Sequence, residues 1–403
     1  MAALPGELSG CSALHLFSVL GVVMQKISPS LQDYDWGSKS FIQELLGITN
    51  ADILAEAWYG AHPKAPSLIQ DTNLLSMIEQ DPHYWLGPNT AKMPFLLKIL
   101  AANKALSIQV HPNKTQAEQG FAEENQKGIA LSDPRRCFRD DNHKPELMMA
   151  LTDFYALCGF REYTQVIDIF DSLKLTRLFS TFASFAKYPN SQNFSELYLQ
   201  ILQYPDPKEL NTALLKLSIN GEYAHLISWM KKLNEVYPGD PAIISPLLMN
   251  LIKLRPYEAI YLDAGIIHAY LEGSGIEIMA SGDNVLRAGL TSKHIDISML
   301  CEIMTFAPFM PEIQAAPSEG KYLHGYQSAA KDFKLYHLSV SNEDNALNIQ
   351  GIKIVLCLSG EIKFSSDESS LKLSRGESAV ISASRKELFI SGSGTAVIAA
   401  VGQ

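Results

Sequence analysis

Residues 253–261 (KLRPYEAIY) and 372–380 (KLSRGESAV) resemble each other within a chain of 403 residues. Each stretch reads Lys-Leu, three further residues, Glu and a small residue, and each then enters an apolar run. We interpret each one as a turn between two strands of a β-barrel, so the chain is expected to hold two related barrels. Ten residues beyond its Glu the first copy has His268, whereas the second has Glu387. This difference predicts that the first barrel carries the chemistry.

A segment that interrupts the first barrel has a different apolar pattern. Val166, Ile169 and Phe170 follow the spacing of one helix face, and the spacing returns at Leu226 and Met230. The sequence therefore predicts a mainly β protein with an α-helical insertion. The predicted units are an extension over 1–23, a catalytic barrel over 24–161 and 240–320, the helical insertion over 162–239, and a second barrel over 321–403.

Two apolar runs in the first barrel segment leave their secondary structure open. They are 93–100 (MPFLLKIL) and 148–157 (MMALTDFYAL), each next to Pro or Asp residues. Such runs fit a strand buried on both faces or a short helix equally well, because neither shows a decisive period.

The composition is that of an acidic globular protein. Hydrophobic residues make up 47% of the chain, and the formal net charge is −10. The charge argues against nonspecific binding to nucleic acid, since no overall excess of cations is available to neutralise a phosphate backbone. The five cysteines are far apart and form no CxxC pair. We therefore expect a reducing, cytoplasmic location. We also expect a monomer, with no nucleic acid or membrane among its partners.

The first residues form a separate extension. The apolar run 13–23 (ALHLFSVLGVV) is too short to span a bilayer, which takes about 20 residues. No Lys or Arg precedes it, as one would in a secretory signal. We interpret 1–23 as a mistaken upstream start, with Met24 as the true first residue.

Residues 107–112 (SIQVHP) carry the clearest chemical signal. On a strand, alternate side chains share a face, so Ser107, Gln109 and His111 are expected to point the same way. Polar side chains on one face of an apolar strand need partners if they are buried. A metal or polar ligand is one solution, and a solvated barrel mouth is the alternative.

Two further segments offer metal-binding groups. Glu146 follows the polar run 141–145 and is placed to begin a strand, although an ordinary charged loop would read the same way. His268 stands in the small and apolar run 264–270, where a hydrogen-bonded core histidine is the ordinary interpretation. Together with Gln109 and His111 they form an N/O set that suits zinc, iron, manganese or cobalt.

A cationic pair follows shortly after His268. Arg287 and Lys293 flank a short turn, and both would suit a phosphate group or a sugar oxyanion. The alternative is two surface cations paired with Asp283 and Asp296.

These motifs resemble those of the type I phosphomannose isomerases, in particular the bacterial ones. The resemblance rests on QVHPNK (109–114), DNHKPE (141–146), GIIHAY (265–270) and SGDNVLRAGLT (281–291), with YDWGSKS (34–40) and PFLLKIL (94–100) upstream. It extends from Met24 to the end of the chain. It implies two cupin-like jelly-roll barrels plus a helical domain. It also implies zinc-dependent interconversion of mannose 6-phosphate and fructose 6-phosphate through an enediolate.

The resemblance also implies roles for single residues. The zinc ligands, one ion per chain, would be Gln109, His111, Glu146 and His268. The catalytic groups would be Arg287, Lys144, His143 and Asp283. The substrate-binding groups would be Lys98, Ser107, Trp36, Glu56, Tyr270 and Lys293.

The chemical role of each of these groups stays open at this point. Arg287 would stabilise the enediolate, and Lys98, Ser107 and Lys293 are candidates for holding the phosphate. His143, Lys144 and Asp283 are alternatives for the base. Two rival functions are an iron-dependent oxygenase and a non-catalytic sugar-binding protein. The cations at 98, 287 and 293 count against the oxygenase, and the complete ligand set counts against loss of catalysis.

Overall fold

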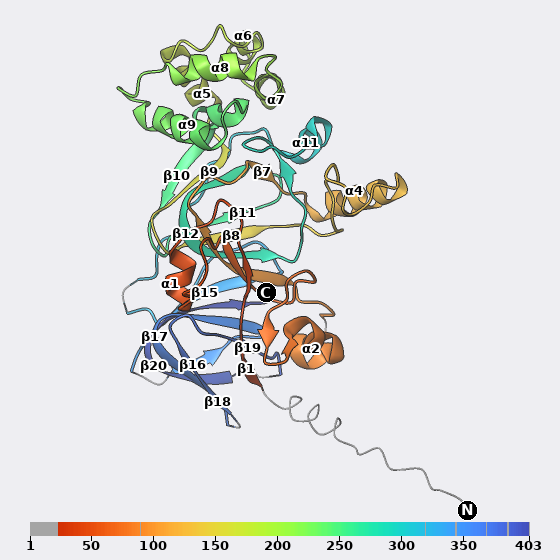
Figure 1. The fold of residues 1–403 in the computed structure, drawn as a ribbon, viewed down its shortest axis with the longest axis vertical. Helices are drawn as coiled ribbons and strands as arrows, with labels where there is room; N and C mark the ends of the chain where they lie inside the picture. Colours follow the sequence, from red (N-terminus) through yellow and green to blue (C-terminus); the bar gives the residue numbers. More distant parts are fainter. Residues whose placement is uncertain are drawn as a thin grey trace, which may run out of the picture.

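A computed structural model describes residues 23–88, 90–318, 320–342, 345–367, 369–384 and 387–402. The chain stacks a helical layer, a first sheet and a second sheet along its long axis (Figure 1). The interpretation of 1–23 as an extension lies outside the described residues, except for Val23. Val23 is buried, and its carbonyl oxygen accepts a hydrogen bond from the backbone N–H of Ser382.

The first sheet contains ten strands among the described residues. β10, β9, β12, β6, β3 and β2 lie side by side in that order, and the other strands pair off this path. β12 pairs with β6, β7, β8 and β9, so it is the centre of the sheet. The strands are β2 Ser30–Gln32, β3 Glu56–Tyr59, β6 Phe95–Ala102, β7 Gln109–Val110, β8 Glu146–Ala150, β9 Phe154–Phe160, β10 Met249–Leu254, β11 Ala259–Leu262, β12 His268–Ala280 and β13 Leu286–Arg287.

The two ambiguous apolar runs are both β structure. The run 93–100 lies mostly in β6, and all residues of β6 are buried. The run 148–157 is divided between β8 and β9 and includes the turn that joins them. The three strands, β6, β8 and β9, are buried on both faces, so they lack the polar alternation that would have identified them.

The second sheet contains eight strands in the part of the chain that is described. Its first strand comes from the start of the chain, because β1 pairs with β19. The strands are β1 Met24–Ile27, β14 Leu323–Gly325, β15 Lys334–Ser341, β16 Asn345–Asn348, β17 Lys353–Ser365, β18 Ser370–Ser374, β19 Ser378–Ile381 and β20 Glu387–Ala400. A separate hairpin pairs β4 Leu68–Ile69 with β5 Thr72–Asn73.

The two similar stretches are equivalent turns, as predicted. One joins β10 to β11, and the other joins β18 to β19. In each turn the Glu carboxylate accepts a hydrogen bond from a backbone N–H at 2.8 Å: Glu258 from Arg255, and Glu377 from Ser374. The residue before each Glu has a left-handed φ, 68° at Tyr257 and 84° at Gly376. The next strands then begin at His268 and at Glu387.

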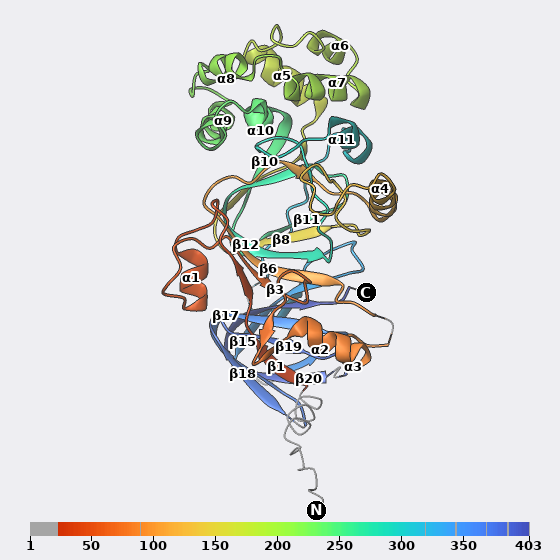
Figure 2. The same ribbon diagram turned by 45° about the vertical axis from the view of Figure 1, so that its right-hand side comes forward.

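The helical layer covers the end of the first sheet opposite the second sheet (Figure 2). Val166, Ile169 and Phe170 are buried on one face of α5, as their spacing predicted, and Leu226 and Met230 are buried on α9. Its helices are α5 Tyr163–Ser172, α6 Phe182–Lys187, α7 Ser191–Leu202, α8 Pro207–Leu215, α9 Ala224–Val236, the 3₁₀ helix η1 Pro241–Ile244 and α10 Ser245–Leu248. The remaining helices are α1 Phe41–Leu46, α2 Leu74–Gln80, α3 Pro82–Leu86, α4 Lys114–Gln126 and α11 Ile297–Ile303.

Shared apolar cores join the three layers. One core combines the buried faces of the helices with Val110 of β7 and Leu286 of β13. Another combines Leu97 of β6 with Leu356 of β17. The helical layer therefore supports the strands that carry Gln109 and Arg287, because they pack on the same buried side chains.

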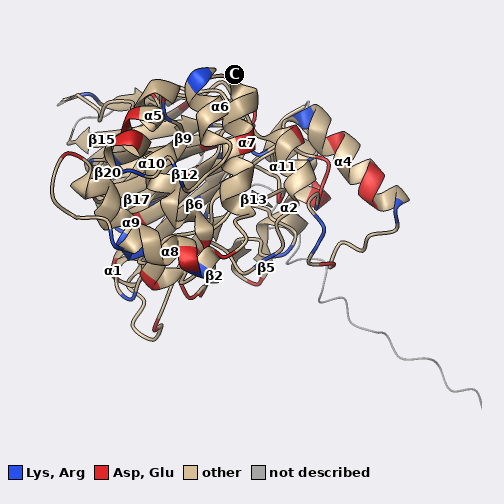
Figure 3. Cartoon of the chain, turned by 90° about the horizontal axis from the view of Figure 1, so that it is seen from above, with Lys and Arg blue, Asp and Glu red and all other residues tan. Residues whose placement is uncertain are grey.

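Three properties bear on location and partners. None of the helices in the described residues is long and apolar enough to cross a bilayer. The cysteines at 137, 158, 301 and 357 are free thiols. Seen from the helical end, cationic and anionic segments are interspersed (Figure 3).

Candidate metal centre and cleft

Two histidines and a carboxylate converge inside the first barrel. His111 follows β7, Glu146 begins β8 and His268 begins β12, and each is at most 2% exposed. The Nε2 atom of His111 lies 3.3 Å from Glu146 Oε1, and the Nε2 atom of His268 lies 3.3 Å from Oε2. One ligand atom from each residue falls within 4.8 Å of the other two, which is the spacing of groups around one metal ion.

The hydrogen bonds of the two imidazoles leave their Nε2 atoms free for a metal. His111 Nδ1 lies 2.6 Å from the carbonyl oxygen of Asn284, and His268 Nδ1 lies 2.9 Å from that of Ile266. A carbonyl only accepts, so each Nδ1 carries the proton and each Nε2 presents a lone pair. Both Nε2 atoms are buried without a hydrogen-bond partner among the described residues. The 3.3 Å contacts with Glu146 therefore surround a metal position and are not hydrogen bonds.

The charges of the cluster favour metal binding. Burial, together with nearby Lys144, lowers the pKa of His111 to about 4, so the imidazole is neutral at pH 7. Burial alone would raise the pKa of Glu146, but Lys144 and His111 hold it well below its usual range. Lys144 Nζ lies 2.8 Å from Glu146 Oε1. The site thus offers two imidazoles, of which that of His111 is neutral, and one carboxylate.

Gln109, the predicted fourth ligand, lies beside these residues in the sheet. Its register partners are His268 on β12 and Arg287 on β13. Gln109 is half-buried, and its predicted role as a ligand stays a prediction. Ser107 precedes it in the same extended segment and is also half-buried.

A second group of buried charges adjoins the metal cluster. Lys98 Nζ lies 2.9 Å from Glu277 Oε2 and 3.6 Å from Glu56 Oε1. Burial alone would lower the pKa of Lys98, but these two carboxylates raise it above its ordinary value. The Tyr270 hydroxyl donates to Glu146 Oε2 at 3.4 Å, and burial with Glu146 raises its pKa well above the usual one. Tyr270 thereby lies between the metal cluster and the Lys98 group.

Cations line an open cleft beside this barrel. The cleft has a volume of about 840 Å³, and its lining includes Arg139, Arg287, Lys293 and Lys64. Burial and the neighbouring Arg139 lower the pKa of Arg287. Arg287, burial and Arg139 likewise lower the pKa of Lys293. Cations gathered in this way suit an anion, because a bound anion relieves the repulsion that Arg287 and Lys293 experience.

Asp283 lines the same cleft but is already paired. His62 Nε2 lies 3.1 Å from its Oδ1, and Lys64 Nζ donates to its Oδ2 at 2.6 Å. Burial alone would raise the pKa of Asp283, but His62 and Lys64 lower it below its ordinary value. Asp283 is therefore an ionised carboxylate with two partners.

Two predicted residues lie apart from the metal cluster. His143 Nε2 lies 2.9 Å from Asp332 Oδ2, so it joins the segment before β8 to the segment before β15. Trp36 stacks on Tyr34 at a ring-centroid distance of 5.7 Å, and Tyr34 lines the cleft. The structure brings Lys144, Glu146, His111, His268 and Tyr270 together, and it places Arg287, Lys293 and Asp283 along the cleft.

Sequence reasoning missed several residues of the site. Glu277 is an acid within the apolar run IEIMA that ends strand β12, a signal that could have found it. Trp58 donates its indole N–H to Glu56 at 2.7 Å and lies under Lys98. Arg139, His62 and Lys64 come from loops with no pattern of their own.

Comparisons with known proteins agree with this geometry. Residues 24–163 match the family described as phosphomannose isomerase type I, catalytic domain, and residues 325–401 match the mannose-6-phosphate isomerase cupin domain. The mannose-6-phosphate isomerase of Salmonella typhimurium is 38% identical over 92% of this chain and 98% of its own length. The one from Escherichia coli is 37% identical over 92% of this chain and 98% of its own.

Solved structures are similar over nearly the whole chain. The zinc-bound holo form of a mannose 6-phosphate isomerase has a TM-score of 0.86 at 36% identity and covers 95% of this chain and 100% of its own. The apo form from Salmonella typhimurium has a TM-score of 0.87 with the same identity and coverage. This likeness confirms the predicted fold of two cupin-like barrels and a helical region.

Proposed function

The chain belongs to the type I phosphomannose isomerase family, and we propose that it interconverts D-mannose 6-phosphate and D-fructose 6-phosphate through an enediolate. The observation that carries the proposal is the pair of buried, unpartnered Nε2 atoms that face Glu146. Buried nitrogen lone pairs without partners are unfavourable unless a metal satisfies them.

Zinc fits the site by the chemistry of its donors. His111, Glu146 and His268 would hold it, with Gln109 as the fourth ligand and the remaining position open to substrate. A bound Zn²⁺ supplies Lewis-acid polarisation of the sugar oxygens. The carbonyls of Asn284 and Ile266 orient the two imidazoles for this purpose.

Lys144 is the residue that we assign to proton movement between C1 and C2. Of the three candidate bases, it is the one in direct contact with the metal cluster. Asp283 is held ionised by His62 and Lys64, and His143 is bound to Asp332. Arg287 would stabilise the negative charge that develops on the enediolate oxygens, because its own charge is fixed.

The phosphate group would bind at the Arg139–Arg287–Lys293 end of the cleft. The mutual repulsion of these cations supports this assignment, and Ser107 remains a candidate hydrogen-bond donor. Lys98 is held by two carboxylates, which supports a role in ordering Glu277 and Glu56 around the sugar. Trp36 and Tyr270 would complete the walls of the substrate site.

Removing the metal tests the proposed function. The purified protein should convert mannose 6-phosphate, lose this activity on chelation, and regain it when zinc is added back. Turnover is measured by coupling fructose 6-phosphate to an indicator reaction, and zinc content by atomic emission. A folded, zinc-loaded protein without turnover would contradict the proposal and favour a sugar-binding role.

Replacing Lys293 with alanine should weaken phosphate binding. The KM for mannose 6-phosphate should rise about tenfold with a smaller change in kcat, since one cation contact to a phosphate contributes about 1.5–3 kcal/mol. The matched control is Lys187→Ala, which removes an exposed lysine of α6. An unchanged KM in Lys293→Ala would place the phosphate elsewhere.

A further inference from the structure

The two cleft cations lie at the ends of the loop that follows β13: Arg287 is the last residue of β13, and Lys293 is at the far end of the loop. Its backbone is held in unusual conformations, with φ of 128° at Gly289 and 51° at Leu290. A Cβ atom at Gly289 would come within 2.2 Å of the Ala242 Cβ. The loop therefore packs closely against η1, where the chain passes from the helical layer back to the first sheet.

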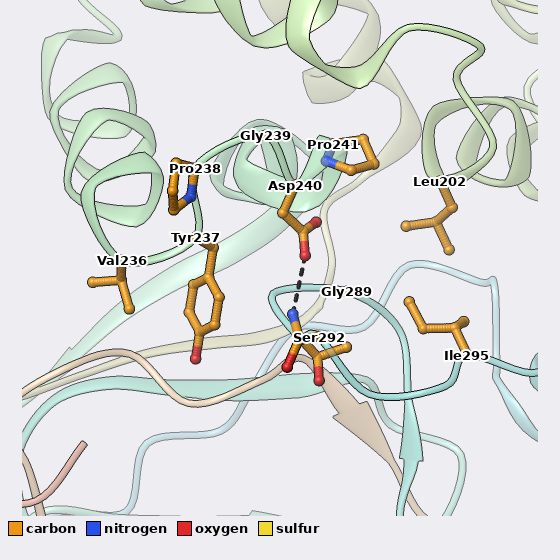
Figure 4. A pocket seen from close by; sticks show the side chains of 11 residues that line it. Leu202, Val236, Tyr237, Pro238, Gly239, Asp240, Pro241, Gly289, Ser292 and Ile295 are labelled. Carbon is orange, nitrogen blue, oxygen red and sulfur yellow. Dashed lines mark hydrogen bonds between the residues drawn. The ribbon is translucent and has the colours of Figure 1, made fainter. Parts of the chain in front are cut away.

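Asp240 connects that corner to the loop. Its Oδ1 accepts a hydrogen bond from the backbone N–H of Ala242 at 2.8 Å. Its Oδ2 accepts one from the backbone N–H of Thr291 at 3.0 Å, the dashed line in Figure 4. Its own carbonyl oxygen accepts from the side-chain amide of Asn211 on α8 at 3.2 Å. One carboxylate thus joins the 3₁₀ helix η1 to the middle of the loop.

The loop separates two cavities. Asp240 lines a cavity of about 570 Å³ under the helical layer, together with Gly289, Thr291 and Ser292. Arg287, Ser292 and Lys293 line the catalytic cleft on the other side. Ser292 lines both cavities, so the loop lies between them. Asp240 lines the cavity under the helical layer and does not line the cleft.

Other contacts tie the start of the loop to the metal-binding strand. The Ile108 N–H donates to the Gly289 carbonyl at 3.0 Å, and the Ala288 N–H donates to the Ile108 carbonyl at 2.8 Å. The Tyr198 hydroxyl donates to the Ala288 carbonyl at 3.1 Å. These bonds hold residues 288 and 289, whereas Asp240 holds residue 291, two positions before Lys293.

We propose that Asp240 is a positioning residue for the isomerase, which sets the loop so that Lys293 and Arg287 meet the phosphate and the enediolate. The inference rests on the proposed function. A carboxylate presents an acceptor to both backbone donors at once, whereas an amide presents only one and turns its N–H₂ toward the other. Without Asp240 the loop keeps the bond from Tyr198 to residue 288 but loses the bond that holds residue 291, and a displaced Lys293 binds the phosphate less well.

Asp240→Asn tests the proposal in the zinc-loaded, full-length enzyme. The dissociation constant for inorganic phosphate, measured by calorimetry, should rise about tenfold, and the KM for mannose 6-phosphate should rise with it. The zinc content should stay the same. Gly289→Ala should give the same result with the carboxylate of Asp240 kept, because the new methyl group would lie 2.2 Å from the Ala242 Cβ and displaces the loop.

The matched control is Asp206→Asn. Asp206 also accepts two backbone N–H bonds and begins α8 of the same layer, but it is exposed and distant in sequence from the loop. One oxygen of Asp206, Oδ1, accepts both bonds, and asparagine keeps that oxygen, so this variant should leave phosphate affinity and zinc content unchanged. Equal phosphate affinity in Asp240→Asn and wild type, including no binding in either, would overturn the proposal. Phosphate binding without turnover in the wild type would instead count against the proposed function alone.

Discussion

Replacing His268 with alanine should release zinc and lower kcat/KM by roughly a thousandfold, because Lewis-acid stabilisation of the transition state is worth several kcal/mol. His268 supplies one of the two buried Nε2 atoms at the metal position. Without it, only His111 and Glu146 of this cluster would be left to hold the ion. Zinc content by atomic emission and kcat/KM for mannose 6-phosphate measure the two effects.

His337→Ala is the matched control for this variant. His337 is a buried histidine of the second sheet, packed edge-on against Tyr257 at a centroid distance of 4.8 Å. Its loss should reduce the free energy of unfolding by about 1–3 kcal/mol while zinc content and kcat/KM stay within about twofold of the wild type. A His268→Ala protein that keeps a full equivalent of zinc would refute the assigned metal site.

Replacing Lys144 with arginine should lower kcat by about 10²–10⁴-fold and leave zinc bound. Arginine keeps the positive charge beside Glu146, but it does not give up its proton at accessible pH, so it cannot move a proton between two carbons. The exchange of deuterium from C2 of the substrate into water should slow by a similar factor.

Lys253→Arg is the corresponding control. Lys253 also pairs with a carboxylate, Asp153 at 2.6 Å, but on the exposed edge of β10. This variant should keep the wild-type kcat. If Lys144→Arg retained kcat within tenfold, another residue would be the base, and the assignment to Lys144 would be wrong.

The second barrel lacks a histidine at the position that corresponds to His268. Its strand β20 begins with Glu387, at the offset where β12 begins with His268. Within the described residues, the group His111, Glu146 and His268 is the one cluster of metal-binding side chains, and it belongs to the first sheet. The second barrel instead packs on the back of the first, where Leu356 shares a core with Leu97.

The sequence by itself determined the elements whose cause is local. The repeated turn before Glu258 and Glu377 depends on a left-handed residue and a Glu that accepts from the backbone, and both are contained in nine residues. The helix faces of α5 and α9 follow from apolar spacing. The motifs around His111, Glu146 and His268 also indicated the metal-binding groups, because side chains of this type seldom occur together in apolar strands.

Only the tertiary structure decided which distant groups meet. Glu277 and Lys98 are 179 positions apart, and the pairing of β12 with β6 brings them to 2.9 Å. His143 is a candidate base by sequence, but the fold gives it Asp332 as a partner. By sequence alone Asp240 would be interpreted as an ordinary helix cap. Only the fold places the loop after β13 within hydrogen-bonding distance of it. Charge pairing and loop position depend on through-space distance, which the local pattern of a sequence does not contain.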